Sequence, residues 1–346
     1  MSHDLPDASP RDSAADRPRR LGVVGTMVWD TIHDRDGVRE PLEEWGGIGY
    51  AMEALCASLP EAWEIVPIVK LGADLADEAL DFLAALPRVR TDIGVRVVPE
   101  PNNRVELRYE DRHRRCERLT GGVGPWIWTE LAPVVRQCDA LYVNFISGYE
   151  LELPAAQGLH AGFRGPTYAD LHSLFLGIGK YGDRVPRPLP SWSEWLRSFD
   201  AVQMNEEEFE LLGRARGDAW LLAAESVGPD LKLIAVTLGP RGAAYVAGPG
   251  FVPDPALWPA VRDRLATPGQ TRSGSVADAS GEVDGDPTGC GDVWGATFFA
   301  RLLAGDGLEE AMATANAMAA RNVGHRGARG LRYHLKGQLM SESEGA

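Results

Sequence analysis

Short apolar runs that end at glycine or polar residues recur along this chain, and stretches with helical spacing separate them. Residues 206–212 and 218–225 are two such helical stretches. Strands that alternate with helices in this way predict a mainly parallel sheet covered on both faces, as in an α/β protein. The predicted strands are residues 21–25, 65–69, 141–145, 167–170, 201–204 and 233–237.

The pattern changes between residues 92 and 119, where polar and apolar positions begin to alternate. Residues 104–109, Arg-Val-Glu-Leu-Arg-Tyr, alternate as a half-exposed strand does. Together with residues 30–45, this segment predicts a small antiparallel sheet that stands off the main body. An ordinary edge hairpin is the alternative.

Three segments fall outside this alternation. Residues 1–20 are rich in Asp, Arg, Pro and Ser and have no apolar stretch like that of a secretory signal, so we expect a disordered tail. Residues 248–285 mix Pro, Asp and Gly around one helix expected at 255–265, and they predict an irregular surface insertion. Residues 336–346 are expected to form a C-terminal tail, which makes residues 21–335 the folded domain.

Composition narrows the class of protein. The chain has 346 residues, 44% of them hydrophobic, which suits one large domain. No apolar run approaches the ~20 residues of a membrane span, and the net charge of −15 argues against nucleic-acid binding. The four cysteines form no Cys-x-x-Cys pair, which is typical of a reducing cytoplasm. We therefore expect a cytoplasmic protein that binds neither nucleic acid nor membrane.

The stretch with the clearest chemistry is Asp286–Asp292, Asp-Pro-Thr-Gly-Cys-Gly-Asp, because the apolar run after it predicts a buried helix opened by a glycine turn. The amides of Gly289, Cys290 and Gly291 would lie at the positive end of that helix and bind a phosphate. A carboxylate beside them, that of Asp292, would take a proton from an attacking hydroxyl. A helix cap is the alternative role for this aspartate.

Polar residues also stand where several predicted strands end. Open α/β sheets bind ligands at the carboxyl ends of their strands, so this convergence predicts a site there. The preference of Asn and Asp for turns is the alternative explanation. The residues are Asp30, Asn144, Asp170, Asn205 and Thr237.

The pattern Asp-x-Thr-Gly-x-Gly-Asp before an apolar helix resembles the signature of the ribokinase-like (PfkB) family of carbohydrate and nucleoside kinases. The similarity continues through residues 308–311, 315–320 and 327–328. The resemblance implies a three-layer αβα fold, with a mainly parallel central sheet and a β lid over the sugar. It also implies transfer of the γ-phosphoryl group of ATP, with Mg²⁺, to a hydroxyl of a sugar or sugar-like compound. Asp292 would be the general base and the turn Gly289 to Gly291 the anion hole.

The resemblance extends to residues outside this turn. Dipole compensation at a helix start is the alternative role for Glu208, and a structural hydrogen bond is the alternative for Asn316. Asp286 matches a position that in part of the family lies near a monovalent cation such as K⁺. The implied sites are Asp30, Gly46, Gly47, Asn144 and Asp170 for the acceptor; Asn205, Thr237, Gly239, Gly242 and Asn316 for the nucleotide; and Glu208 and Asp286 for metal ions.

One departure from the family pattern bears on the acceptor, because Ala51 stands where the family has an Asn that binds sugar. Two other functions stay open. A nucleoside kinase would be favoured by an aromatic lid pocket that includes Trp29, Trp45 or Tyr50. A non-catalytic sugar- or nucleotide-binding sensor that kept the fold would be consistent with the missing Asn. A homodimer formed through the lid is a further option.

Overall fold

The computed structural model describes residues 17–33, 40–109, 115–214, 217–262, 269–281 and 283–338. Most of both predicted tails, residues 1–16 and 339–346, lies outside the described residues. Parts of the predicted lid (34–39 and 110–114) and of the predicted insertion (263–268 and 282) do so as well. None of the helices in the described part of the chain has both the length and the apolar character that a membrane crossing requires.

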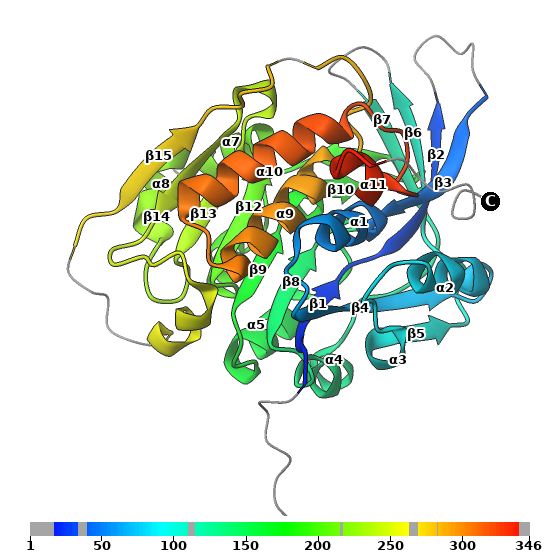
Figure 1. Cartoon of the computed structure of the whole chain (residues 1–346), viewed down its shortest axis with the longest axis horizontal. Helices are drawn as coiled ribbons and strands as arrows, with labels where there is room; N and C mark the ends of the chain where they lie inside the picture. Colours follow the sequence, from blue (N-terminus) through cyan, green and yellow to red (C-terminus); the bar gives the residue numbers. More distant parts are fainter. Residues whose placement is uncertain are drawn as a thin grey trace, which may run out of the picture.

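A nine-stranded sheet forms the centre of the molecule (Figure 1). Neighbouring strands pair in parallel over most of the sheet, and only the last two in the chain pair antiparallel with their neighbours. The predicted mainly parallel sheet is confirmed. In spatial order the strands are β15 (Arg272–Val276), β14 (Ala243–Ala247), β13 (Leu233–Thr237), β12 (Ala201–Asn205), β9 (Thr167–Asp170), β8 (Ala140–Asn144), β1 (Arg19–Val24), β4 (Trp63–Gly72) and β5 (Val95–Val98).

Helices cover both faces of this sheet and complete the three layers. One face carries α1 (Ile48–Ser58), α2 (Ala76–Ala84), α9 (Cys290–Ala304), α10 (Leu308–Asn322) and α11 (Leu331–Leu335). The other carries α4 (Trp128–Val135), α5 (Leu153–Gly162), α6 (Trp192–Arg197), α7 (Glu206–Gly213) and α8 (Ala219–Ser226). A short helix, α3 (Thr91–Gly94), leads into β5.

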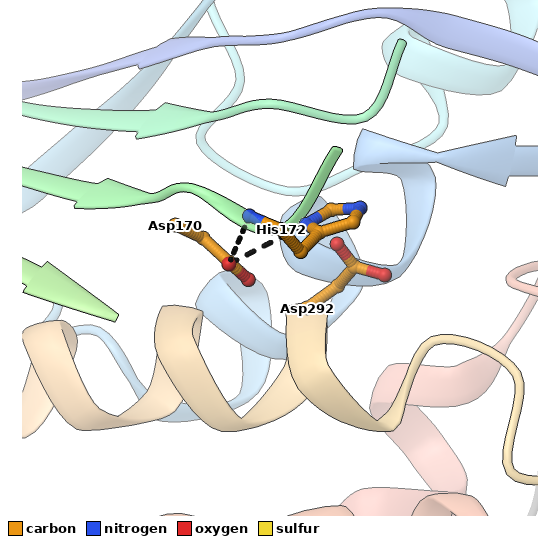
Figure 2. A group of neighbouring side chains, drawn as sticks. All are labelled: Asp170, His172 and Asp292. Carbon is orange, nitrogen blue, oxygen red and sulfur yellow. Dashed lines mark hydrogen bonds and ion pairs between the residues drawn. The ribbon is translucent and has the colours of Figure 1, made fainter. Parts of the chain in front are cut away.

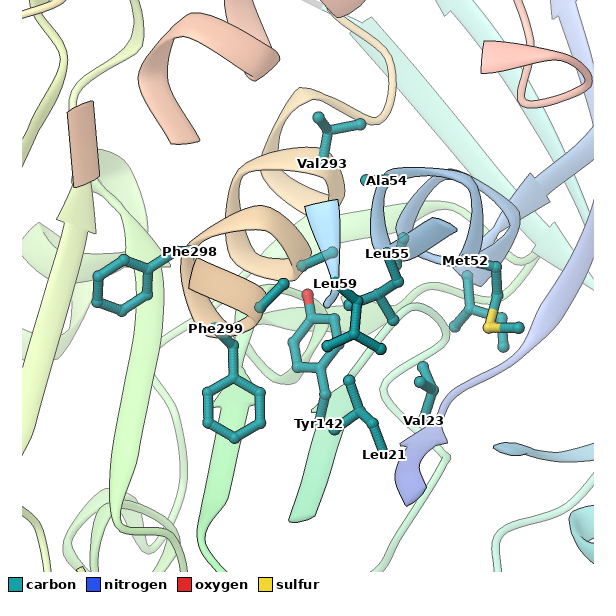
Figure 3. Close-up of a cluster of buried hydrophobic side chains, with 14 of the residues drawn as sticks. Leu21, Val23, Met52, Ala54, Leu55, Leu59, Tyr142, Val293, Phe298 and Phe299 are labelled. Atoms are coloured by element: carbon teal, nitrogen blue, oxygen red, sulfur yellow. The ribbon is translucent and has the colours of Figure 1, made fainter. Parts of the chain in front are cut away.

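Each buried strand supplies side chains to both layers in alternation, as the pleat requires. In β1, Leu21 and Val23 join the core beneath α1 and α9, whereas Val24 joins the opposite core. Figure 3 shows Leu21 and Val23 near Tyr142 of β8 and Phe299 of α9. Strands buried on both faces read as continuous apolar runs, which is why the sequence predicts them well.

A separate four-stranded sheet stands beside the main one and corresponds to the predicted lid. Its small core includes Val28, Ile32 and Leu107. The prediction of an antiparallel lid is wrong for one pair, because β2 and β6 are parallel and the sheet is mixed. The chain visits the main sheet between these two strands and returns in the same direction. In spatial order the lid strands are β3 (Leu42–Gly47), β2 (Met27–His33), β6 (Arg104–Tyr109) and β7 (Arg115–Thr120), and a hairpin of β10 (Leu176–Ile178) and β11 (Arg184–Pro186) adjoins β7.

The segment predicted as an irregular insertion is more ordered than expected, since β15 lies within it and forms the edge of the main sheet. The prediction of a single helix at 255–265 is also wrong. Two 3-10 turns, Pro255–Leu257 and Pro259–Val261, occupy its first part. Pro259 has no amide hydrogen to continue an α-helix from the preceding turn.

Candidate active site

The glycine turn predicted to bind phosphate precedes α9. Gly289 has φ 76° and ψ 0°, a left-handed conformation, and the helix begins at Cys290. A Cβ atom at Gly289 would lie 2.3 Å from the ring of Tyr50, so only glycine fits this turn. Asp286 holds the start of the turn, where its Oδ1 accepts hydrogen bonds from Thr288 N at 2.9 Å and Thr288 Oγ1 at 2.6 Å.

The amide of Cys290 closes the turn and does not face outward. It donates to the Pro287 carbonyl at 3.1 Å, and the amide of Val293 donates to the Gly289 carbonyl at 2.9 Å. The expectation that three successive amides are available for an anion is therefore wrong for Cys290, because Pro287 offers an acceptor within the turn. Among the described residues, no backbone acceptor lies opposite the amide of Gly291.

Asp292 lies in the first turn of α9 and contacts the end of β8. Asn144 Nδ2 donates to Asp292 Oδ1 at 2.7 Å. Asn144 is fully buried, and among the described residues its Oδ1 has no hydrogen-bond partner. The helix approaches the sheet closely here because Gly295 has no side chain, and a Cβ atom there would lie 2.8 Å from the hydroxyl of Tyr142.

Asp170, at the end of β9, belongs to the same site and brings a histidine with it. Figure 2 shows the His172 imidazole between the carboxylates of Asp170 and Asp292. His172 Nδ1 lies 3.4 Å from Asp170 Oδ1, and one ligand atom of each of the three residues lies within 4.8 Å of the other two. Gln203 Nε2 donates to Asp170 Oδ2 and to the Gly291 carbonyl, both at 3.1 Å, so β12 joins the strand end to the glycine turn.

The protonation of His172 sets the charge of this cluster. Burial alone would lower the pKa of His172, but the nearby carboxylate of Asp170, with smaller contributions from Asp292 and Glu208, raises that pKa to about 10. An imidazole that is protonated at neutral pH has no lone pair for a metal ion. Without a metal ion, His172 is therefore a cation beside the carboxylates of Asp170 and Asp292.

Three of the predicted acceptor residues, Asp30, Gly46 and Gly47, lie where the lid meets α1. Asp30 on β2 is buried, and a Cβ atom at Gly46 would lie 1.7 Å from Asp30 Oδ2, which requires glycine there. Gly47, with φ 57°, precedes α1. Burial raises the pKa of Tyr50 well above its usual range, and the charges of Asp30, Asp286 and Asp292 raise it further. This tyrosine thus lies among carboxylates of both the lid and the glycine turn.

A cavity of about 310 Å³ opens on the other side of the glycine turn. It lies between the ends of β13, α9 and α10, and much of its wall is apolar. Asn316 contributes to the wall, but both ends of its amide are engaged, since Oδ1 accepts from Trp294 Nε1 at 2.7 Å and Nδ2 donates to the Val276 carbonyl at 3.0 Å. Other lining residues are Thr237, Gly239, Gly242, Cys290, Gly291, Ala319 and Val323.

Asn205 and Glu208 form a capping box at the start of α7. Glu208 Oε2 accepts from the Asn205 amide and Glu208 Oε1 accepts from Asn205 Nδ2, both at 2.7 Å. Asn205 Oδ1 in turn accepts from the Glu208 amide at 2.9 Å. Neither residue is among those that line the cavity. The carboxylate of Glu208 is thus held in place by the cap of α7.

The structure brings most of the predicted residues together around one turn. Asp292, Asn144 and Asp170 meet at the carboxyl ends of β8 and β9. Tyr50 lies among the carboxylates of Asp30, Asp286 and Asp292, and Gly46 lies beside Asp30. The predicted nucleotide residues other than Asn205 line the cavity. The sequence analysis missed His172, Gln203 and Trp294. The position of His172 directly after Asp170, at a strand end, was the signal that could have revealed it.

Comparison with known proteins agrees with this architecture. The model of the pfkB family carbohydrate kinases matches residues 178–332, and no curated protein sequence matches the chain. Nucleoside kinase from Burkholderia thailandensis, solved in complex with inosine, is 16% identical, with a TM-score of 0.63 over 92% of this chain and 96% of that one. Ribokinase from Thermotoga maritima is 18% identical, with a TM-score of 0.62 over 92% and 98%.

A pyrophosphate-dependent kinase in the ribokinase family, complexed with a pyrophosphate analog and myo-inositol, is 19% identical, with a TM-score of 0.63 over 91% of this chain and 99% of that one. These likenesses establish a ribokinase-like fold, with its central sheet and separate lid sheet. The family match adds the segment that carries the glycine turn and α9. Residues 178–332 are thus similar to the pfkB family carbohydrate kinases, and the chain as a whole has a ribokinase-like fold.

Proposed function

We propose that this kinase transfers the γ-phosphoryl group of ATP to a hydroxyl of a sugar or sugar-like compound, with Asp292 as the general base. Asp292 takes the proton of the acceptor hydroxyl as its oxygen forms a bond to the γ-phosphorus, and the bond between that phosphorus and the β–γ bridging oxygen breaks to release ADP. The observation that carries this proposal is the position of Asp292. It lies in the first turn of α9, directly after the glycine turn, and accepts a hydrogen bond from Asn144.

The glycine turn is proposed as the anion hole for the transferring group. The start of α9 carries the positive end of the helix dipole, and the Gly291 amide has no backbone acceptor among the described residues. Donors fixed before the reaction stabilise the charge that develops on phosphoryl oxygens without having to reorganise. Cys290 contributes to the shape of the turn through the hydrogen bond that its amide donates to the Pro287 carbonyl.

ATP is the donor that the cavity favours. A volume of about 310 Å³ is within the range of small-molecule sites, and walls formed by Trp294, Ala319 and Val323 suit the faces of a purine base. Pyrophosphate, the donor named for one structural relative, has no apolar part to fill this space. A pyrophosphate-dependent enzyme would leave the cavity beside the turn without a role.

Mg²⁺ fits the acidic residues near the turn through bound water. Asn205 holds the Glu208 carboxylate in place, and Mg²⁺ is an ion that binds few carboxylates directly and keeps several waters. When bound with the donor, the ion would neutralise charge on the phosphates. Asp286 is proposed near a monovalent cation. Thr288 holds one of its oxygens in place, and a K⁺ titration of turnover tests the assignment.

A sugar-like acceptor is preferred to a nucleoside because the lid aromatic residues are already packed. Tyr50 is 2% and Trp45 is 1% exposed, and Trp45 meets Trp29 edge to face with ring centroids 5.2 Å apart. Trp45 and Tyr50 therefore offer no open face on which a base could stack, and the partly buried Trp29 is packed against Trp45. The buried carboxylate of Asp30 is a suitable acceptor for the hydroxyl groups of a polyol.

The test is ADP release from Mg·ATP across pentoses, hexoses, polyols and nucleosides, with pyrophosphate as an alternative donor. We expect turnover with a sugar-like acceptor, and Asp292→Asn should lower it by about 10²–10⁴-fold while leaving ATP binding intact. Asp306→Asn is the matched control, since Asp306 pairs with Arg301 at the opposite end of α9. Near-normal turnover of Asp292→Asn would refute the base role. Binding of ATP or sugar without any acceptor-dependent turnover would favour a non-catalytic sensor.

A further inference from the structure

One histidine lies in the active site without a part in the transfer described above. Building on the base role proposed for Asp292, we propose that His172 is a positioning residue for this reaction: its imidazolium, held by Asp170, keeps the Asp292 carboxylate ionised and directed toward the acceptor hydroxyl. His172 acts through Asp292, and no bond to the substrate is required of it.

Asp170 fixes the histidine at two points. Its Oδ1 accepts the backbone amide of His172 at 3.2 Å and lies 3.4 Å from His172 Nδ1. Its Oδ2 accepts from Gln203 Nε2 at 3.1 Å, so the carboxylate cannot turn away. Asp170 is 2% exposed. In the described part of the chain, it forms an ion pair with His172. A buried carboxylate held in this way requires a nearby cation.

The same imidazolium also stabilises the ionised carboxylate of Asp292. Its carboxylate and that of Asp170 both offer an oxygen within 4.8 Å of His172 and of each other. Two carboxylates at this separation repel each other when both are ionised, and a protonated Asp292 could not accept the hydroxyl proton. The hydrogen bond from Asn144 orients Asp292 Oδ1 but brings no charge. The imidazolium between the carboxylates offsets their repulsion.

The charges around His172 come from three elements. Asp170 on β9, Asp292 on α9 and Glu208 on α7 together outweigh the effect of burial and raise the pKa of His172 to about 10. The phenols that face Asp292, Tyr142 on β8 and Tyr50 on α1, have pKa values raised well above their usual range, chiefly by burial, and stay neutral. His172 is therefore the cation of this group at the pH at which the base must be ionised.

The experiment measures kcat/KM for the acceptor against pH at saturating Mg·ATP, because the acidic limb of that profile reports the essential base of the enzyme. His172→Asn and His172→Gln should move the acidic limb upward by about 1–3 pH units, the effect of losing one opposite charge within this distance. His172→Lys should restore the limb to its original position. Ionisation of the donor is common to all variants and cancels in the comparison.

His160→Asn is the matched control. His160 on α5 lies 3.8 Å from the carboxylate of Asp230, and its side chain is 18% exposed, compared with 27% for His172. It is thus a comparably buried histidine beside an aspartate, on the face of the sheet opposite α9. Its replacement should leave the acidic limb unchanged. Thermal unfolding of every variant shows whether each remains folded.

The outcomes separate this proposal from the base role. Turnover abolished by Asp292→Asn together with an unshifted limb in a folded neutral His172 variant would overturn the positioning role alone. Normal turnover of Asp292→Asn would overturn both. Failure of both neutral variants to fold would also overturn the positioning role, since the fold rather than the reaction would then require the imidazole.

Discussion

The left-handed turn at Gly289 allows a test of the proposed anion hole that leaves every charged group in place. The perturbation is Gly289→Ala, which adds one methyl group before α9. Any L-residue at φ 76° is strained, by about 1–2 kcal/mol. The new Cβ would also lie 2.3 Å from Tyr50 Cδ1 and 2.4 Å from Tyr50 Cγ, closer than nonbonded carbon atoms can approach.

The clash adds to the backbone strain because Tyr50 has little room to move. Its side chain is 2% exposed and packs in the core that includes α1 and α9. Forcing an extra methyl into such a site costs about 1–3 kcal/mol. We therefore expect Gly289→Ala to lower the free energy of unfolding by about 2–5 kcal/mol in total. Displacement of the turn by about 1 Å would reduce turnover by about 10²-fold.

Gly305→Ala at the other end of the same helix is the control. Gly305 has φ 98°, and a Cβ atom there would have nothing within 4 Å. The backbone strain is thus retained without the clash, and we expect a loss of about 1–2 kcal/mol with normal turnover. Urea denaturation gives the free energies of unfolding, and ADP release gives the turnover. Equal destabilisation of the two variants, or normal turnover of Gly289→Ala, would refute the role given to this turn.

The remaining expectations concern a buried ion pair and the donor cavity. Asp200 is fully buried between Lys232, at 2.9 Å, and Arg262, so Asp200→Asn should lower the free energy of unfolding by about 3–5 kcal/mol. Asp139 pairs with Arg17 at the surface, and its side chain is 33% exposed. Asp139→Asn should therefore change the free energy of unfolding by at most about 1 kcal/mol. Burial alone would raise the pKa of Asp200, but the two cations outweigh it and lower that pKa. The difference in free energy of unfolding between wild type and Asp200→Asn, measured by urea denaturation, should therefore be largest above about pH 3.9. It should decrease as the pH falls through the lower pKa of the folded state. A difference that increases in acid would contradict this. Asn316→Ala leaves two buried groups unpaired and should raise the KM for ATP without changing the KM for the acceptor, whereas equal changes in both would contradict the position of the cavity.

The sequence predicts the buried part of the fold best. Strands such as β8 and β13 are apolar on both faces, and their residues identify them without any knowledge of neighbours. The edge strand β15 reads Arg-Ser-Gly-Ser-Val and is largely exposed, so no hydrophobic alternation marks it. What makes it a strand is its backbone pairing with β14, which the residue types do not encode. The parallel lid pair likewise depends on the path of the chain.

The site was predictable as a set of residues and less so as a set of bonds. Strand ends converge in any open α/β sheet, so Asn144 and Asp170 could be placed near Asp292 from position alone. Which group donates to which could not. Glu208 bonds back to Asn205 because the helix start leaves amides without partners, and the Cys290 amide bonds to Pro287 because the turn brings that carbonyl within reach.

The hydrogen bonds of Gln203 connect the strand-end residues to the glycine turn. Its Nε2 donates to Asp170 on one side and to the Gly291 carbonyl on the other, while its Oε1 accepts from Tyr168 at 2.6 Å. A Cβ atom at Gly295 would lie 2.3 Å from the same Oε1, so the small residue in α9 is what lets the helix reach this amide. The sheet edge and the glycine turn are therefore joined directly, one bond from the carboxylate that holds His172. Because Gln203 joins a strand end proposed to bind the acceptor to the turn proposed to bind the phosphates, we expect a change at Gln203 to affect donor and acceptor steps together.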